Sequence, residues 1–336
     1  MINRTQEEIM KNWGVDNSDT PLVSVKCMTY NHEKYISQAL DGFLMQKTNF
    51  PFEVLVHDDA STDKTADIIR KYEKKFPKIV KPIYETENQY SKGTHHTKIN
   101  TMLRGKYIAL CEGDDYWIDP LKLQKQIDFL ETHPAYGMCY GKVRQYYEDE
   151  KKFSSVLFGS ALSSYQKLIY GNNPIPTLTV CMRKEIYWSY RSDDSIKKQK
   201  WLMGDYPLWI KISHDSKIHF FDEVFGVYRI LKNSASHSED FSKRIAFQKS
   251  KTDISNYFCK VYNLPEIIWD ENKALFDILY LDLMQMGYSK SLALKAKSVY
   301  PKIKAKNLRL KIIRFAISFK FLFSLYRNLY YFVRKV

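Results

Sequence analysis

The stretch YIALCEGDDYWIDP, residues 107–120, joins an apolar run of the kind that a sheet buries to a group of carboxylates. Glu112, Asp114 and Asp115 follow the run directly. Carboxylates this close together raise one another's pKa unless a cation or a donor-rich ligand lies between them. The stretch therefore predicts a buried strand that ends in a binding site.

Similar apolar runs alternate with helical patterns through the first part of the chain. Strands are predicted in LVSVKCMTY (22–30), FEVLVHDD (52–59), IVKPIYE (79–85) and KYIALC (106–111), with helices near 34–46, 63–76 and 95–104. This order predicts βαβ units and an α/β fold with a mostly parallel sheet flanked by helices. Ligands bind beyond the carboxyl ends of such strands, and the ends here are TYN (29–31), HDDASTD (57–63) and CEGDD (111–115).

The alternation of short apolar strands and helical patterns ends near residue 150. The pattern predicts a helix in GDYPLWIKISHD (204–215), a pair of strands in KIHFFDEVFGVYRI (217–230) and a mainly helical segment over 240–300. The chain is therefore expected to end in a helical region.

Two interpretations of the acidic strand ends differ in chemistry. Magnesium and manganese take one or two protein carboxylates together with substrate phosphates, so Asp114 and Asp115 suit a metal that carries a diphosphate. Alternatively, GDD is a solvated turn, and Asp58 and Asp59 are turn formers. A second acidic end on the same sheet edge favours the ligand site.

The charge of the chain is concentrated at one end. The formal net charge is +14, but residues 301–336 hold ten Lys or Arg and no Asp or Glu, which leaves +4 on the other 300 residues. The five cysteines are widely spaced, which fits a reducing compartment. Residues 1–20 lack the apolar segment of a secretory signal, so we expect a cytoplasmic protein.

Four segments resemble the inverting glycosyltransferases of family 2, which adopt the GT-A fold. They are SVKCMTYNHEKYISQAL (24–40), VLVHDDASTDKTADII (54–69), GKYIALCEGDDYWIDPLKL (105–123) and GDYPLWI (204–210). The resemblance implies a Rossmann-like GT-A sheet, a nucleotide-sugar donor, often UDP-linked, and a divalent metal, Mn²⁺ or Mg²⁺.

The resemblance also implies roles for individual residues. The first-loop residues Thr29, Tyr30 and Asn31 match positions that bind the nucleoside, and Asp59 matches the acidic residue that meets the base. Asp114 matches the residue near the ribose and Asp115 the metal ligand. Glu112 stands where many members of the family have Asp, which leaves its role open.

Inverting transfer needs one general base to take the proton of the acceptor hydroxyl. Asp205 occupies that position by resemblance, although an Asp before an apolar helix is also an ordinary N-cap. A family His expected two residues beyond Arg229 is replaced by Leu231. Arg229, Lys232 and His237 are the candidates to take over its contact with metal or diphosphate.

The tail NLRLKIIRFAISFKFLFSLYRNLYYFVRKV, residues 307–336, interleaves cations with large apolar side chains. Its uncharged runs are too short to span a bilayer. The cationic stripe of its first half is out of phase with that of its second half, which predicts two amphipathic helices with a break near 318–320. Such helices suit a membrane interface, whereas packing on the domain or on a partner is the alternative.

The sequence as a whole predicts a metal-dependent inverting glycosyltransferase that is peripheral on the cytoplasmic face of the membrane, with a saccharide or lipid-linked acceptor in polysaccharide biosynthesis. The alternatives are a nucleotidyltransferase and a basic nucleic-acid-binding protein. The expected divisions are an N-terminal extension (1–20), a GT-A domain (21–238) with a nucleotide-sugar half (21–135) and an acceptor half (136–238), a helical region (239–300) and a basic amphipathic tail (301–336).

Overall fold

The chain forms two compact units. The computed structural model describes residues 2–14, 20–90, 92–94, 96–231, 240–286, 290–303 and 308–333. The first unit comprises Met1–Lys200 and Leu208–Ile230, and the second comprises Trp201–Pro207 and Leu231–Val336. The finer boundaries expected at residues 20, 135, 238 and 300 stay predictions.

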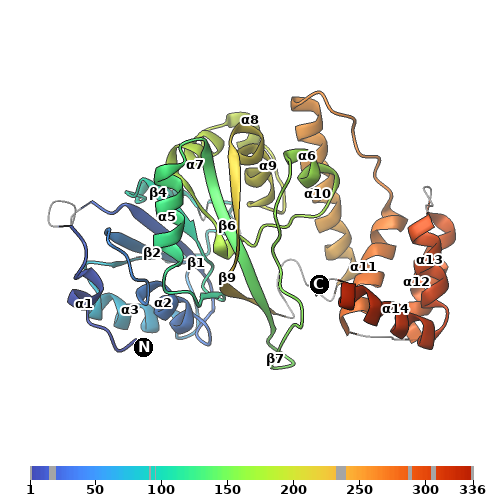
Figure 1. Cartoon of the computed structure of the whole chain (residues 1–336), viewed down its shortest axis with the longest axis horizontal. Helices are drawn as coiled ribbons and strands as arrows, with labels where there is room; N and C mark the ends of the chain where they lie inside the picture. Colours follow the sequence, from blue (N-terminus) through green and yellow to red (C-terminus); the bar gives the residue numbers. More distant parts are fainter. Residues whose placement is uncertain are drawn as a thin grey trace. The chain divides into compact units, whose positions relative to one another are not determined.

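A mixed sheet organises the first unit (Figure 1). Its parallel half runs in the order β3 (Val80–Tyr84), β2 (Phe52–Asp58), β1 (Val23–Thr29) and β4 (Tyr107–Leu110). These strands are the four that the alternating pattern predicts. The α/β fold with parallel strands and flanking helices is thus confirmed.

The other half of the sheet continues from β4 with antiparallel pairing. Its order is β8 (Cys181–Arg183), β6 (Tyr136–Tyr147), β9 (Lys217–Ile230) and β5 (Tyr116–Trp117), while β7 (Lys152–Phe153) pairs with β6. The green β6 and the yellow β9 run side by side in Figure 1 and pair in parallel.

The predicted pair of strands over 217–230 is wrong, because β9 is one continuous strand of 14 residues. The long β6 pairs with it along its length. Tyr140 pairs with Phe220 and Lys142 with Val224, so a bulge accommodates the intervening residues 221–223. The polar residues in the middle of the segment belong to this bulge and not to a hairpin turn.

Helices cover the parallel strands on both faces. Val25 and Cys27 of β1 belong to a core that includes side chains of α2 (Ile36–Leu44), α3 (Thr65–Lys75) and α5 (Lys122–Thr132). The opposite face of β1 carries Lys26, which contacts α4 (Thr97–Thr101) and α7 (Lys184–Arg191). The remaining helices of this part of the chain are α1 (Gln6–Met10), α6 (Tyr165–Tyr170), η2 (Thr177–Thr179), α8 (Asp194–Lys197) and α9 (Tyr206–Asp215).

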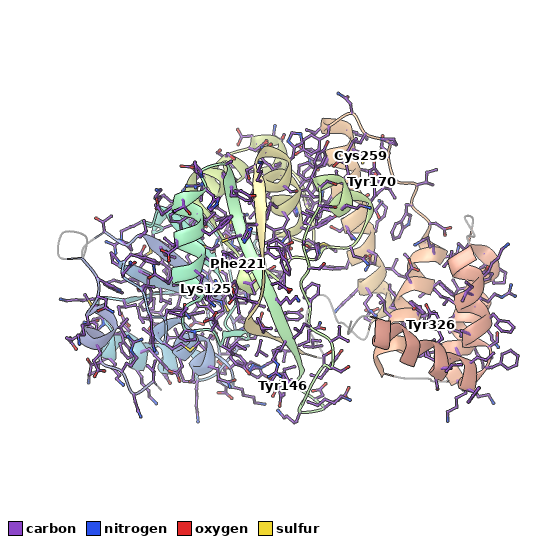
Figure 2. All side chains as sticks on the ribbon, viewed as in Figure 1. Lys125, Tyr146, Tyr170, Phe221, Cys259 and Tyr326 are labelled. Atoms are coloured by element: carbon purple, nitrogen blue, oxygen red, sulfur yellow. The ribbon has the colours of Figure 1, made fainter. Side chains whose placement is uncertain are left out.

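The second unit is helical, as the sequence predicts. It contains α10 (Phe241–Val261), α11 (Glu271–Met286), α12 (Lys290–Val299), η3 (Tyr300–Lys302), α13 (Leu308–Ile317) and α14 (Lys320–Val333). The interruption between α13 and α14 confirms the predicted break near 318–320. Helices α11–α14 share a core, and the hydroxyls of Tyr280 and Tyr326 lie 3.0 Å apart within it (Figures 1 and 2). Across the described residues, no helix combines the length and the apolar character needed to cross a bilayer.

Candidate active site

Backbone hydrogen bonds bring three strand ends together at one edge of the first unit. Thr29 lies opposite Asp58 in the parallel register of β1 and β2. The N–H of Asp59 donates to the carbonyl of Thr29 at 3.0 Å, and the N–H of Gly113 donates to the carbonyl of Met28 at 2.9 Å. The first loop, the second loop and the acidic turn after β4 therefore meet at one place.

Asn31 links the first loop to the second. Its φ of 55° is a left-handed conformation that Asn tolerates better than most residues. Its side-chain oxygen accepts from the N–H of Thr62 at 2.8 Å, and its own N–H donates to the Ser61 hydroxyl at 2.9 Å. The neighbouring Tyr30 has 44% of its surface exposed. The loops are thus fixed to each other while an aromatic ring stays accessible beside them.

Asp59 is buried and holds the segment that follows β3. One carboxylate oxygen accepts from the N–H of Gln89 at 2.6 Å and the other from the N–H of Tyr90 at 2.9 Å. Its neighbour Asp58 accepts from the Ser61 hydroxyl, while burial raises the pKa of the Asp58 carboxyl. Both oxygens of Asp59 thus already have backbone donors, a structural role that the sequence did not indicate.

The acidic turn places its three carboxylates in different surroundings. Glu112 is exposed, whereas Asp115 is 4% exposed and Asp114 lies between these extremes. The Oδ1 atom of Asp115 accepts from the N–H of Arg229 at 2.7 Å. Burial, and next the nearby charge of Asp114, raise the pKa of Asp115 well above its usual range. A positive charge beside the turn would offset the cost of ionising this buried carboxyl.

Arg229 of β9 braces this turn and is 5% exposed. Its guanidinium donates to the carbonyl of Asp114 at 3.0 Å, to Glu148 at 3.2 Å and to the side-chain oxygen of Gln38. It also lies 4.6 Å from the ring centroid of Tyr35. Because every guanidinium nitrogen has a protein acceptor, Arg229 is committed to positioning the turn. Lys232 and His237 lie outside the described residues.

Two buried polar atoms face the acidic turn without a hydrogen-bond partner among the described residues: Thr29 Oγ1 and His32 Nδ1. Both lie close to Gly113, where an added Cβ would be 2.7 Å from Thr29 Oγ1 and 3.0 Å from His32 Nδ1. The other ring nitrogen of His32, Nε2, is 4.0 Å from Asp114 Oδ2. Unpaired buried polar atoms are costly, so this arrangement suits a ligand that supplies the missing partner.

The oxygen donors of the turn also suit a hard divalent cation. Mg²⁺ and Mn²⁺ prefer oxygen and need only one or two protein carboxylates when a diphosphate completes the shell. Across the described chain, no three His, Cys, Asp or Glu side chains converge on one point. Asp114 and Asp115 therefore fit a metal that arrives with a phosphorylated ligand better than one held by protein alone.

Asp205 precedes α9 and belongs to the segment Trp201–Pro207 of the second unit. Its Oδ1 accepts from the N–H of Tyr206 at 2.7 Å, and the side chain is partly exposed. The nearby acids engage other side chains: Asp193 caps α8, and Asp215 pairs with Lys211. The carboxylate of Asp205 thus has a local helix-start contact and a solvent-accessible surface.

The amino-acid sequence matches a known protein family. The family model described as glycosyl transferase family 2 matches residues 24–191, which is half of the chain. The chain belongs to glycosyl transferase family 2.

Curated relatives share the same region. An uncharacterized protein of Mycobacterium tuberculosis is 36% identical over 227 residues, which cover 66% of this chain and 62% of the relative, so the match leaves more than a third of that relative uncovered. The Escherichia coli protein named UDP-Glc:alpha-D-GlcNAc-diphosphoundecaprenol beta-1,3-glucosyltransferase WfaP is 29% identical over 64% of this chain and 80% of its own.

A solved structure shares the fold. The mannosyltransferase PcManGT from Pyrobaculum calidifontis, solved in complex with GDP-Man and Mn²⁺, matches with a TM-score of 0.53 over 92% of this chain and 87% of its own. At 16% identity this likeness speaks for the GT-A fold alone. The GT-A expectation drawn from the family 2 motifs is thereby confirmed.

Several residues of this family 2 site were not predicted from the sequence. The motif TYNHE contains His32, but nothing in the motif indicated that its ring would approach both Gly113 and Asp114. Gln38 is one helix turn into α2, and its contact with Arg229 depends on the position of β9. Arg229 was a candidate for contact with metal or diphosphate, and nothing in the sequence indicated that it would instead position the acidic turn.

Substitution of Gly113 by Ala tests the close packing of the acidic turn. A Cβ at this position would lie 2.8 Å from the Cβ of Thr29, so the turn or β1 must move. We expect the free energy of unfolding to fall by about 1–3 kcal/mol in denaturant titrations. Gly14→Ala is the control, because no atom lies within 4 Å of the added Cβ there. Equal stability of the Gly113→Ala and Gly14→Ala variants would contradict this packing.

Proposed function

We propose that this chain is a metal-dependent inverting glycosyltransferase that transfers a sugar from a UDP-linked donor to a hydroxyl of a saccharide or lipid-linked acceptor. The observation that carries the proposal is the buried carboxylate of Asp115, beside Asp114, at an edge where Thr29 Oγ1 lacks a partner among the described residues. Membership of family 2 supports it. WfaP is named as a glucosyltransferase that uses UDP-Glc, which supports the choice of a UDP-linked donor.

The donor site in this proposal is formed by residues of the first loop, Asp59 and the acidic turn. The exposed ring of Tyr30 contacts the base, and Thr29 contributes its unpaired hydroxyl, while Asn31 holds the first loop in place. Asp59 serves the base through the Gln89–Tyr90 backbone that it positions. Asp114, which is partly exposed, contacts the ribose.

A divalent cation, Mn²⁺ or Mg²⁺, would be held by Asp115 with Asp114 beside it. When bound, it supplies positive charge that stabilises the leaving diphosphate. The structure of PcManGT, which was solved in complex with Mn²⁺, supports this choice. Burial and the charge of Asp114 raise the pKa of Asp115, and a bound cation would lower it again by favouring the ionised form.

Transfer proceeds by a single displacement at the anomeric carbon. Asp205 accepts the proton of the acceptor hydroxyl as that oxygen forms its bond to the sugar, and the bond to the nucleoside diphosphate breaks on the opposite side. The configuration is inverted. Asp205 is chosen by its place in the motif GDYPLWI and by its partly exposed carboxylate at the start of α9.

Two further observations support the proposed acceptor and the proposed location of the protein. The name of WfaP includes a diphosphoundecaprenol-linked acceptor, which supports a lipid-linked substrate for this chain and a role in polysaccharide biosynthesis. The basic tail, residues 301–336, supports a peripheral position on the cytoplasmic face of the membrane.

The products of turnover test this function. Incubation of the protein with a panel of nucleotide-sugars and Mn²⁺ should release free nucleoside diphosphate, with the largest yield from a UDP-sugar. Chromatography of the nucleotides gives the measurement. A parallel incubation with a nucleoside triphosphate and a sugar phosphate covers the alternative, because release of pyrophosphate there would identify a nucleotidyltransferase. No release of nucleoside diphosphate from any nucleotide-sugar would contradict the glycosyltransferase.

Asp205→Asn tests the general base. We expect turnover with an acceptor to fall by about a hundredfold or more, because the amide cannot take the proton. Thermal stabilisation by the nucleotide-sugar should be retained, since donor binding does not use this residue. Asp194→Asn is the matched control, as Asp194 is exposed and pairs with Lys197. Turnover close to that of the control would exclude Asp205 as the base.

A further inference from the structure

Helix α13 has two apolar faces, and among the described residues one of them packs into a core while the other is exposed. Leu310, Ile313 and Ile317 are buried and belong to the core shared with α11 and α12. The same core includes Phe323 of α14. The tail is therefore packed against the helical unit through these residues, as one of the sequence alternatives stated. That packing leaves the outward side chains of α13 and α14 to be explained.

Those outward side chains form what we call the aromatic edge: Ile312, Phe315, Phe319, Phe321 and Leu325. Their exposed fractions run from 49% for Leu325 to 77% for Phe321. The rings of Phe315 and Phe319 contact each other, with centroids 5.8 Å apart. Scattered exposed apolar residues are ordinary, but five large ones between Ile312 and Leu325, two of them in contact, indicate an interaction surface.

Cations border the aromatic edge on the same two helices. Lys311, Arg314 and Lys320 are exposed, and the guanidinium of Arg314 lies 4.6 Å from the ring centroid of Tyr300. Residues 301–336 contain no acidic residue, so the surface has one sign of charge. A partner must therefore be anionic and must also accept large apolar side chains.

We propose that the aromatic edge is the insertion surface with which this chain binds an anionic phospholipid bilayer, a step that rests on the proposed lipid-linked acceptor. Phe315, Phe319 and Phe321 enter the boundary between headgroups and acyl chains, while Lys311 and Lys320 contact anionic headgroups. The buried face of α13 keeps the helix attached to its unit. Peripheral binding of this kind needs no spanning helix.

Two other occupants fit the chemistry less well. A second copy would bring an identical cationic surface against this one, which like-charge repulsion opposes. A nucleic acid would satisfy the cations and could stack on Phe, but Ile312 and Leu325 offer it no stacking surface. A bilayer satisfies both the cations and the aliphatic side chains.

Flotation of the full chain with lipid vesicles tests the proposal. The wild type should float with phosphatidylcholine vesicles that contain phosphatidylglycerol, and much less with phosphatidylcholine alone. The double variant Phe315→Ser, Phe321→Ser should lose at least about tenfold in partitioning to anionic vesicles. Lys311→Glu, Lys320→Glu should lose binding mainly at low salt, where electrostatic attraction is largest.

The matched control is Leu157→Ser, Ile268→Ser, which removes two exposed apolar side chains outside the tail. It should float like the wild type, and circular dichroism should show that all variants keep the wild-type helix content. Equal flotation of the Phe variant and the control overturns the proposal. The proposal is also overturned if the wild type does not bind anionic vesicles but dimerises or binds an oligonucleotide in sedimentation experiments.

Donor turnover in the absence of vesicles separates this proposal from the proposed function. The Phe variant should release nucleoside diphosphate from a nucleotide-sugar at the wild-type rate, because its substitutions lie in α13 and α14. A wild type that floats but turns over no nucleotide-sugar would reject the glycosyltransferase while leaving the membrane surface in place. A wild type that turns over donor but does not float would reject the membrane surface while leaving the proposed glycosyltransferase in place.

Discussion

The hydrogen bond between the buried carboxylate of Asp115 and the backbone N–H of Arg229 is the interaction on which the site depends. It joins the turn after β4 to β9, which lies in the other half of the sheet. The guanidinium of the same Arg229 then fixes the carbonyl of Asp114 and reaches Gln38 of α2. One residue pair thus sets the position of the acidic turn relative to the strand ends beside it.

The negative charge of the acidic turn is only partly compensated at this edge of the sheet. Burial disfavours the charged form of Asp115, and the adjacent Asp114 adds repulsion. Arg229 compensates in part, but its guanidinium is also shared with Glu148. In the proposed function, a divalent cation that binds with a diphosphate would complete the compensation. The close packing of Gly113 against Thr29 keeps the acidic turn beside the end of β1.

The sequence predicted the local elements well and the long-range contacts poorly. The parallel strands follow from apolar runs separated by helical patterns, and the break between α13 and α14 follows from the phase shift of their cations. The single strand β9 could not be predicted, because its bulge at residues 221–223 exists only in register with β6. Similarly, the partners of Asp59 and Arg229 are far away in the chain, so their roles emerge only in the folded structure. The face of α13 that is buried is set by its packing on α11 and α12.

The central claim is that the acidic turn binds a nucleoside diphosphate together with a divalent cation. Calorimetric titration of UDP into the protein, with Mn²⁺ and then with excess chelator, measures this most directly. Removal of Mn²⁺ should weaken UDP binding by at least about tenfold in the wild type, and Asp115→Asn should remove the difference between the two conditions. UDP affinity that is the same in the wild type with and without a divalent cation would contradict the account.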